Sequence, residues 1–164
     1  MLFRSLGLPL LAVGMAAALS RRWGQLSAGW LAVATRFSFA LVPLGFGLWL
    51  AHASFHFLTS YDTVVPVIQR FAADRGWNAL GEPAWVSGCC RRVANWLPRL
   101  EILFLDVGLL LSLYAAYRIA LAHTVSLPRA LKALAPWALL LALLFAAGVW
   151  IVLQPMQMRG TIEG

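Results

Sequence analysis

Charged residues are scarce in this chain of 164 residues. Only 12% of them are Asp, Glu, Lys or Arg, whereas 62% are hydrophobic. A soluble domain carries roughly 25% charged residues, because polar groups must cover its apolar core. The chain lacks the residues for such a surface, so its apolar segments must face something other than water. Lipid meets that requirement, and the composition excludes an ordinary soluble fold.

Acidic residues are the rarer charge. Six Asp and Glu stand against thirteen Lys and Arg, which gives a net charge of +7. In a soluble protein this balance would suggest a nucleic-acid partner. Here the basic residues lie between apolar runs, as positive-inside loops and anionic headgroups favour, and no basic patch alternates with aromatic residues. We therefore expect the lipid bilayer, and no nucleic acid, as a partner.

Cysteine is nearly missing too, since Cys89 and Cys90 are the only two. A disulfide between adjacent cysteines needs a strained ring, and no Cys-x-x-Cys motif is present. We expect free or intermolecularly paired thiols, so that changing both to Ser leaves function intact. A Gly-rich phosphate loop, a nucleophile elbow and a zinc-protease motif are also missing. The chain is therefore not expected to be an enzyme by itself.

Four apolar runs predict transmembrane helices at about 5–20, 37–58, 100–122 and 133–154. A span needs roughly 20 apolar residues, and the first run is short for one. It could instead be the core of a signal peptide cleaved near Ala16–Ala18, but Arg21 and Arg22 directly behind it favour an uncleaved helix. The expected fold class is all-α: a polytopic membrane protein forming a single membrane domain over 1–164.

The segment 62–99 is the longest polar stretch. Asp62 and Thr63 before an apolar run predict a helix start. A short amphipathic helix is expected to follow, lying on the membrane or capping the bundle. Its apolar face, opposite Arg70 and Asp74, would consist of Val64, Val67, Ile68 and Phe71.

Loop charges predict the orientation. The loop after the first run carries Arg21, Arg22 and Arg36, and the loop before the fourth carries Arg118, Arg129 and Lys132, with no acid in either. Short basic loops favour the cytoplasmic side, whereas long loops translocate largely regardless of charge. Both termini and the long 62–99 loop are therefore expected outside.

Ionisable residues inside a span are functional candidates, because the bilayer makes them costly. His52 and His56 are four residues apart and share one helix face. At about 1.5 Å per residue, His52 and Asp106 each lie roughly 10 Å from the expected outer ends of their helices. The two are therefore predicted at matching depth, and the fourth helix would bring Met156 and Met158 to the same surface. Glu101 beside Arg99 is expected to be a solvated interfacial pair.

Three interpretations of this cluster remain open. Asp106 could accept a hydrogen bond from His52 and lock helix packing. His52, His56 and Asp106 could form an outer-leaflet site that accepts protons from a quinol. His52 and His56 could bind a metal with Met156 and Met158, a pair that suits Cu(I). Haem is disfavoured, since two His on one helix face cannot supply opposite axial ligands.

Two segments resemble a known family. Leu41–Thr59, "LVPLGFGLWLAHASFHFLT", and Trp150–Thr161, "WIVLQPMQMRGT", are similar to the C-terminal membrane module of membrane-bound 4Fe–4S polyferredoxin electron-transfer proteins of bacteria. The resemblance covers Arg36 to Thr161. It implies a multi-pass subunit of the bacterial cytoplasmic (inner) membrane that belongs to a respiratory-type electron-transfer assembly and anchors an iron–sulfur or cytochrome partner.

The chain departs from this family at its clusters. Such proteins bind iron–sulfur clusters on Cys-x-x-Cys-x-x-Cys-x-x-x-Cys-Pro runs, and this sequence has no such run. No Fe–S ligands are carried over; the cofactor is left unknown, with quinone as a candidate. A cofactor-free structural or assembly protein, or a small copper- or metal-handling membrane protein, are the alternatives.

Overall fold

Helices make up every regular element in the residues that the computed structural model describes, which are 2–83, 85 and 96–154. The expected all-α fold class is confirmed for these residues. The α-helices are α1 (Leu2–Gly24), α2 (Trp30–Ser38), α3 (Val42–Ser60), α4 (Val64–Asp74), α5 (Leu97–Ala122) and α6 (Leu127–Val152). Short 3₁₀ turns at Phe39–Leu41, Tyr61–Thr63 and Asn78–Leu80 complete the elements.

Three helical segments are long and apolar enough to cross a membrane: Trp30–Asp74, Leu97–Ala122 and Leu127–Val152. Their length and composition make the chain a multi-pass helical membrane protein. They contain the second and third of the expected spans and all but the last two residues of the fourth. α1 is helical over the first expected span but does not belong to this set. A fourth crossing at 5–20 therefore stays a prediction.

The last helix begins earlier than its apolar run. α6 starts at Leu127 rather than near residue 133, with Ser126 in an extended conformation before it. Pro128 lies in the first turn, where a backbone N–H would have no acceptor within the helix, so that proline costs no hydrogen bond there. Pro136 lies inside α6 and is buried, and the helix continues through it. Arg129 and Lys132 thus belong to a helical turn and not to a loop.

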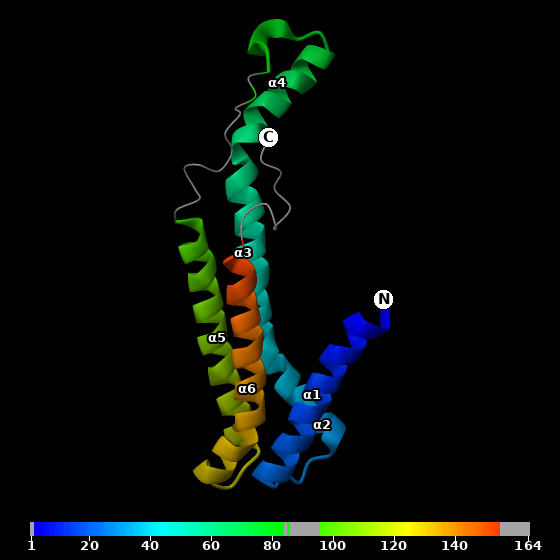
Figure 1. Cartoon of the computed structure of the whole chain (residues 1–164), viewed down its shortest axis with the longest axis vertical. Helices are drawn as coiled ribbons and strands as arrows, with labels where there is room; N and C mark the ends of the chain where they lie inside the picture. Colours follow the sequence, from blue (N-terminus) through cyan, green and yellow to red (C-terminus); the bar gives the residue numbers. More distant parts are fainter. Residues whose placement is uncertain (1, 84, 86–95, 155–164) are drawn as a thin grey trace.

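The main helices alternate in direction (Figure 1). α5 packs against α3 on one side and α6 on the other, and α1 packs along α6 before diverging from it toward the N-terminus. We call the end where α5 begins and α6 ends the Leu97 end. The opposite, Val125 end holds the α1–α2 and α5–α6 connections. The two groups of basic residues that the sequence analysis assigned to short loops thus share one end of the bundle, as expected.

Small residues let α3 and α5 approach closely. A Cβ added at Gly47 would lie 2.6 Å from the carbonyl oxygen of Phe104, and one at Gly108 would lie 3.1 Å from the Cα of Leu44. The backbone N–H of Leu44 donates a hydrogen bond of 2.9 Å to Oγ of Ser112. Within lipid, such backbone proximity and interhelical hydrogen bonding replace the hydrophobic effect as the source of helix association.

α1 and α6 are joined in a similar way at the Val125 end. A Cβ added at Gly24 would lie 2.5 Å from the Cβ of Ala133. The buried hydroxyl of Ser20 donates a hydrogen bond of 2.7 Å to the carbonyl oxygen of Ala133. Beside this contact, the ring of Phe37 stacks on that of Trp137 with centroids 5.3 Å apart.

The predicted amphipathic helix forms, but it does not cap the bundle. α4 begins at Val64 and is joined to α3 by a single 3₁₀ turn, so it continues beyond the packed helices (Figure 1). Arg70 and Asp74 form an exposed ion pair of 3.0 Å. The expected apolar face is exposed, and no helix of the described bundle covers it. Its members are Val64, Val67, Ile68 and Phe71.

Candidate ligand-binding cavity

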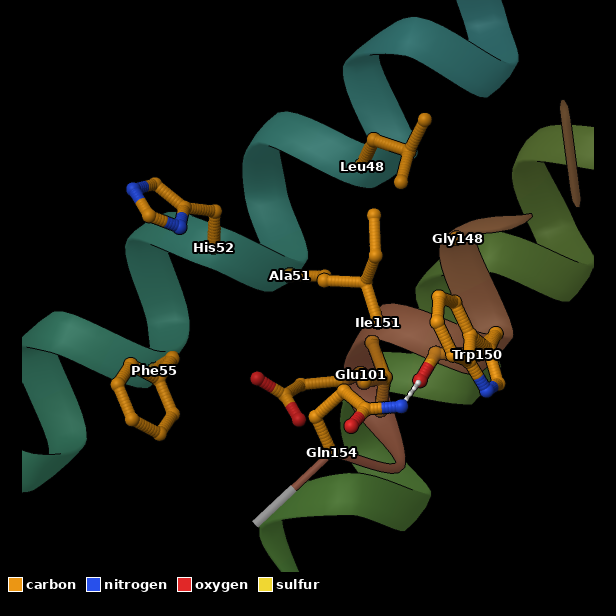
Figure 2. Close-up of a pocket in the computed structure, with 10 residues that line it drawn as sticks. Leu48, Ala51, His52, Phe55, Glu101, Gly148, Trp150, Ile151 and Gln154 are labelled. Atoms are coloured by element: carbon orange, nitrogen blue, oxygen red, sulfur yellow. Dashed lines mark hydrogen bonds between the residues drawn. The ribbon is translucent and has the colours of Figure 1, made fainter. Parts of the chain in front are cut away.

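A cavity of about 520 Å³ lies between α3, α5 and α6 toward the Leu97 end. Figure 2 shows its side chains arriving from these three helices. Most of the lining is apolar, with one carboxylate, one carboxamide and one imidazole among the described residues. The lining residues are Leu48, Ala51, His52, Phe55, Glu101, Gly148, Trp150, Ile151, Val152 and Gln154.

Glu101 is the carboxylate of this cavity. Its residue is only 2% exposed, and its side chain points from α5 toward the space between α3 and the end of α6 (Figure 2). The prediction of a solvated interfacial pair with Arg99 was wrong. Glu101 belongs to the buried face of α5, whereas Arg99, two positions earlier and about 200° around the helix, is exposed. That face consists of Leu97, Glu101, Leu105, Gly108, Ser112, Ala116 and Ala120.

The close contacts between α3 and α5 also set the depth of each candidate. Gly47 is level with Phe104, and Leu44 is level with Gly108. Because the helices are antiparallel, His52 is level with the residues just before Glu101, and Asp106 with those around Gly45. Asp106 therefore lies about 9 Å deeper than His52 at 1.5 Å per residue.

The predicted matching depth of His52 and Asp106 was therefore wrong. Counting each residue from its own helix end failed, because α3 continues past the start of α5 (Figure 1). Asp106 is exposed on the outer face of α5, away from the cavity that His52 borders. The carboxylate that shares a cavity with His52 is Glu101.

His52 and His56 do share one face of α3, as expected. Their ring centroids are 4.5 Å apart in an edge-to-face arrangement, and both residues are exposed. The ring of His52 turns away from the cavity that its backbone borders (Figure 2). Within the described part of the chain, no group of three or more His, Cys, Asp or Glu could hold a metal.

Four of the residues discussed above, Met156, Met158, Cys89 and Cys90, lie outside the described residues. The metal interpretation, which joins Met156 and Met158 to the two imidazoles, therefore stays a prediction.

Gln154 is the second polar group that the sequence interpretation missed. It is half-buried just beyond α6, and its amide Nε2 donates a hydrogen bond of 3.3 Å to the carbonyl oxygen of Trp150. The amide oxygen takes no part in that bond. Glu101 and Gln154 thus place an acceptor and an amide on the same largely apolar cavity. Cavities of roughly 300–1,000 Å³ with few polar groups are typical of sites for small lipophilic ligands.

Comparison with protein-family models, curated proteins and solved structures finds no match to this chain. The polyferredoxin resemblance therefore stays a prediction from two short segments.

Proposed function

We propose that the protein is a membrane subunit that binds a quinol-class lipid in the cavity between α3, α5 and α6 and accepts protons from it. The observation that carries this proposal is a buried carboxylate, Glu101, lining a largely apolar cavity of about 520 Å³. A quinol has the matching chemistry, because it joins an apolar tail to a ring with two hydroxyl groups. The proposed site keeps His52 from the sequence prediction and replaces Asp106 by Glu101.

The position of Glu101 supports a role in proton transfer. Burying an ionisable group within a membrane bundle costs free energy, and such residues mark proton pathways and ligand sites. Glu101 is the fifth residue of α5, about 6 Å from its start, so a proton has a short path to the Leu97 end. In the proposed complex the Glu101 carboxylate accepts a hydrogen bond from one quinol hydroxyl, and the amide of Gln154 bonds the ring's other oxygen.

Oxidation of one quinol to a quinone releases two protons and two electrons. In the proposed reaction Glu101 accepts one proton and the imidazole of His52 accepts the other, after its ring turns from the outward orientation in Figure 2. The electrons pass to a redox centre on a partner subunit, an iron–sulfur or cytochrome protein of the kind that the resemblance implies. In this proposal the chain is a subunit of a respiratory-type assembly of the bacterial inner membrane, as the resemblance implies.

The test compares two acid-to-amide changes in the same helix. Glu101→Gln alters the cavity, whereas Asp106→Asn alters the outer face of α5 and serves as the matched control. The protein is purified in mild detergent with its native lipids, and bound quinone is extracted and quantified. Affinity for a short-tailed quinol, kept reduced under anaerobic conditions, is then measured by the change in tryptophan fluorescence, since Trp150 borders the cavity.

We expect Glu101→Gln to weaken quinol binding about tenfold, the effect of losing one charge-assisted hydrogen bond from a quinol hydroxyl to the carboxylate, and Asp106→Asn to leave it unchanged. A second variant, Ala51→Phe, keeps Glu101 but fills the cavity, and should abolish binding while the protein stays folded. Absence of bound quinone in the unaltered protein, or equal effects of the two amide variants, would overturn the proposal.

An assembly role is the second candidate, and the exposure of Asp106 favours it. An acid within a span normally faces a bundle interior or a water-filled cavity, because lipid solvates it poorly. A neighbouring subunit packed on this face of α5 would cover it. Asp106→Leu should then reduce the amount of partner that co-purifies. If Asp106 instead faces only lipid, the same change should leave the co-purifying proteins unaltered and raise the thermal stability.

A further inference from the structure

Exposed basic residues concentrate at the Val125 end. They belong to the C-terminal turn of α1, the end of α2, the end of α5 and the first turns of α6, and no acid lies in these segments. The described acids all lie between Asp62 and Asp106, toward the other end or within the bundle. The positive potential at the Val125 end is therefore not neutralised locally. The residues are Arg21, Arg22, Arg36, Arg118, Arg129 and Lys132.

A second cavity of about 290 Å³ opens among these charges. It lies at the α1–α2 connection, and its lining joins two guanidinium groups to an indole ring. The lining residues are Ala18, Arg21, Arg22, Leu26 and Trp30. Arg21 and Arg22 thus border a concave surface.

Three local bonds and contacts hold this cavity in shape. The N–H of Leu26 donates a hydrogen bond of 3.1 Å to the carbonyl oxygen of Arg21, and Gln25 between them adopts a positive φ of 52°. The side chain of Leu26 is buried. Trp30 Nε1 donates a hydrogen bond of 3.2 Å to the carbonyl oxygen of Gly14, which fixes the indole over α1. The connection is therefore built to present both arginines beside a fixed aromatic ring.

An apolar track leads away from the arginines along α1. Leu11, Met15 and Leu19 are each exposed, by 64%, 63% and 40% respectively. Their spacing of four residues places them on one line of the helix surface, and the next position along that line is close to Arg22. A molecule with an anionic head and long apolar chains matches a basic cavity followed by an apolar track. A small anion would occupy only the basic cavity.

We propose that this cavity binds the phosphate group of an anionic phospholipid, with Arg21 and Arg22 on the phosphate and an acyl chain along the α1 track. Arginine suits this role, because its planar guanidinium donates paired hydrogen bonds to phosphate oxygens. Basic pockets between membrane helices recognise phospholipid headgroups by this chemistry. The site lies at the opposite end of the bundle from the quinol cavity and does not depend on it.

The test uses the full chain in phosphatidylcholine nanodiscs that contain increasing fractions of phosphatidylglycerol. Lipid that stays bound after transfer to detergent is counted by native mass spectrometry. The variant Arg21→Gln/Arg22→Gln removes two charges from the cavity, and Arg129→Gln/Lys132→Gln removes two charges from the same end outside it. The second variant is therefore the matched control for the general positive potential.

We expect the cavity variant to retain phosphatidylglycerol roughly tenfold less and the control to stay within about twofold of the unaltered protein. If the cavity variant does not fold, the single changes Arg21→Gln and Arg22→Gln take its place, each with an expected loss of about threefold. Equal losses in cavity and control variants, or no phosphatidylglycerol preference in the unaltered protein, would overturn the proposal. Release of the lipid by millimolar inorganic phosphate would show a small-anion site instead.

Discussion

The backbone N–H of Leu44 donates its hydrogen bond to the side chain of Ser112 on another helix, at 2.9 Å. Leu44 lies in the first turn of α3, where N–H groups have no acceptor within their own helix. Ser112 is fully buried on α5 beside the close approach of Gly108. One hydroxyl therefore completes the start of α3 and joins it to the middle of α5.

Changing Ser112 to Ala should lower the free energy of unfolding by about 1–3 kcal/mol, because the buried N–H of Leu44 loses its acceptor. The matched control is Ser38→Ala, whose hydroxyl bonds the carbonyl oxygen of Ala34 in its own helix and joins no second helix. That change should stay within about 0.5 kcal/mol. Both values are accessible from unfolding in mixed detergent micelles. Equal stabilities of the two variants would contradict the role assigned to Ser112.

Two glycines of α3, two positions apart, offer a matched pair. A Cβ at Gly47 would lie 2.6 Å from a backbone oxygen of α5, whereas one at Gly45 would meet nothing within 4 Å. Backbone cannot yield as a side chain does, so Gly47→Ala should force the helices apart and cost about 1–3 kcal/mol. Gly45→Ala should be neutral or stabilising by up to about 1 kcal/mol, the usual helix preference for Ala. The midpoints of thermal unfolding should therefore shift in opposite directions, or at least differ clearly.

The helical spans could be predicted from hydropathy, but which face of each helix is buried could not. Both faces of a membrane helix are apolar, so hydrophobic periodicity carries little information on burial. On α5 the informative signal was the spacing of small residues: Gly108, Ser112 and Ala116 mark the buried face. The same face continues toward the N-terminus by one step of three residues to Leu105 and one of four to Glu101, and it leaves Asp106 outside. Weighing ionisable residues by depth alone therefore selected a carboxylate that does not line the described cavity.

Depth itself could not be read from helix ends. The sequence shows where an apolar run stops, but not that α3 and α4 continue beyond the start of α5 (Figure 1). Only the interhelical contacts of Gly47 and Gly108 fix the relative height of the two helices. Similarly, the start of α6 was missed because Arg129 and Lys132 were assigned to a loop. Charges in the first turns of a helix are compatible with a span when those turns lie at the interface.

Because the helices alternate in direction, we expect the two ends of the bundle to lie on opposite sides of the membrane. Single cysteines replace Ser27 and Val125 at the Val125 end, and Ala79 in the connection beyond α4, in a background with Cys89 and Cys90 changed to Ser. All three positions are exposed. With a membrane-impermeant thiol reagent on intact cells, Ala79→Cys should react, whereas the other two should react only after permeabilisation. Labelling of Ala79→Cys and Val125→Cys from the same side would contradict the antiparallel arrangement across the membrane.

Trp137 provides a test of what its indole contributes to the core. Its side chain is fully buried and stacks on Phe37, yet its Nε1 has no hydrogen-bond partner among the described residues. Trp137→Phe keeps an aromatic ring against Phe37 and removes a donor that makes no bond there, so the cost should stay below about 2 kcal/mol. Trp137→Ala leaves a large void and should cost about 3–5 kcal/mol. As a control, Trp150→Phe on the exposed face of α6 should change the unfolding midpoint little. A Trp137→Phe variant as unstable as Trp137→Ala would mean that the N–H has an acceptor in the folded protein, and that this bond rather than ring packing holds α6 against α2.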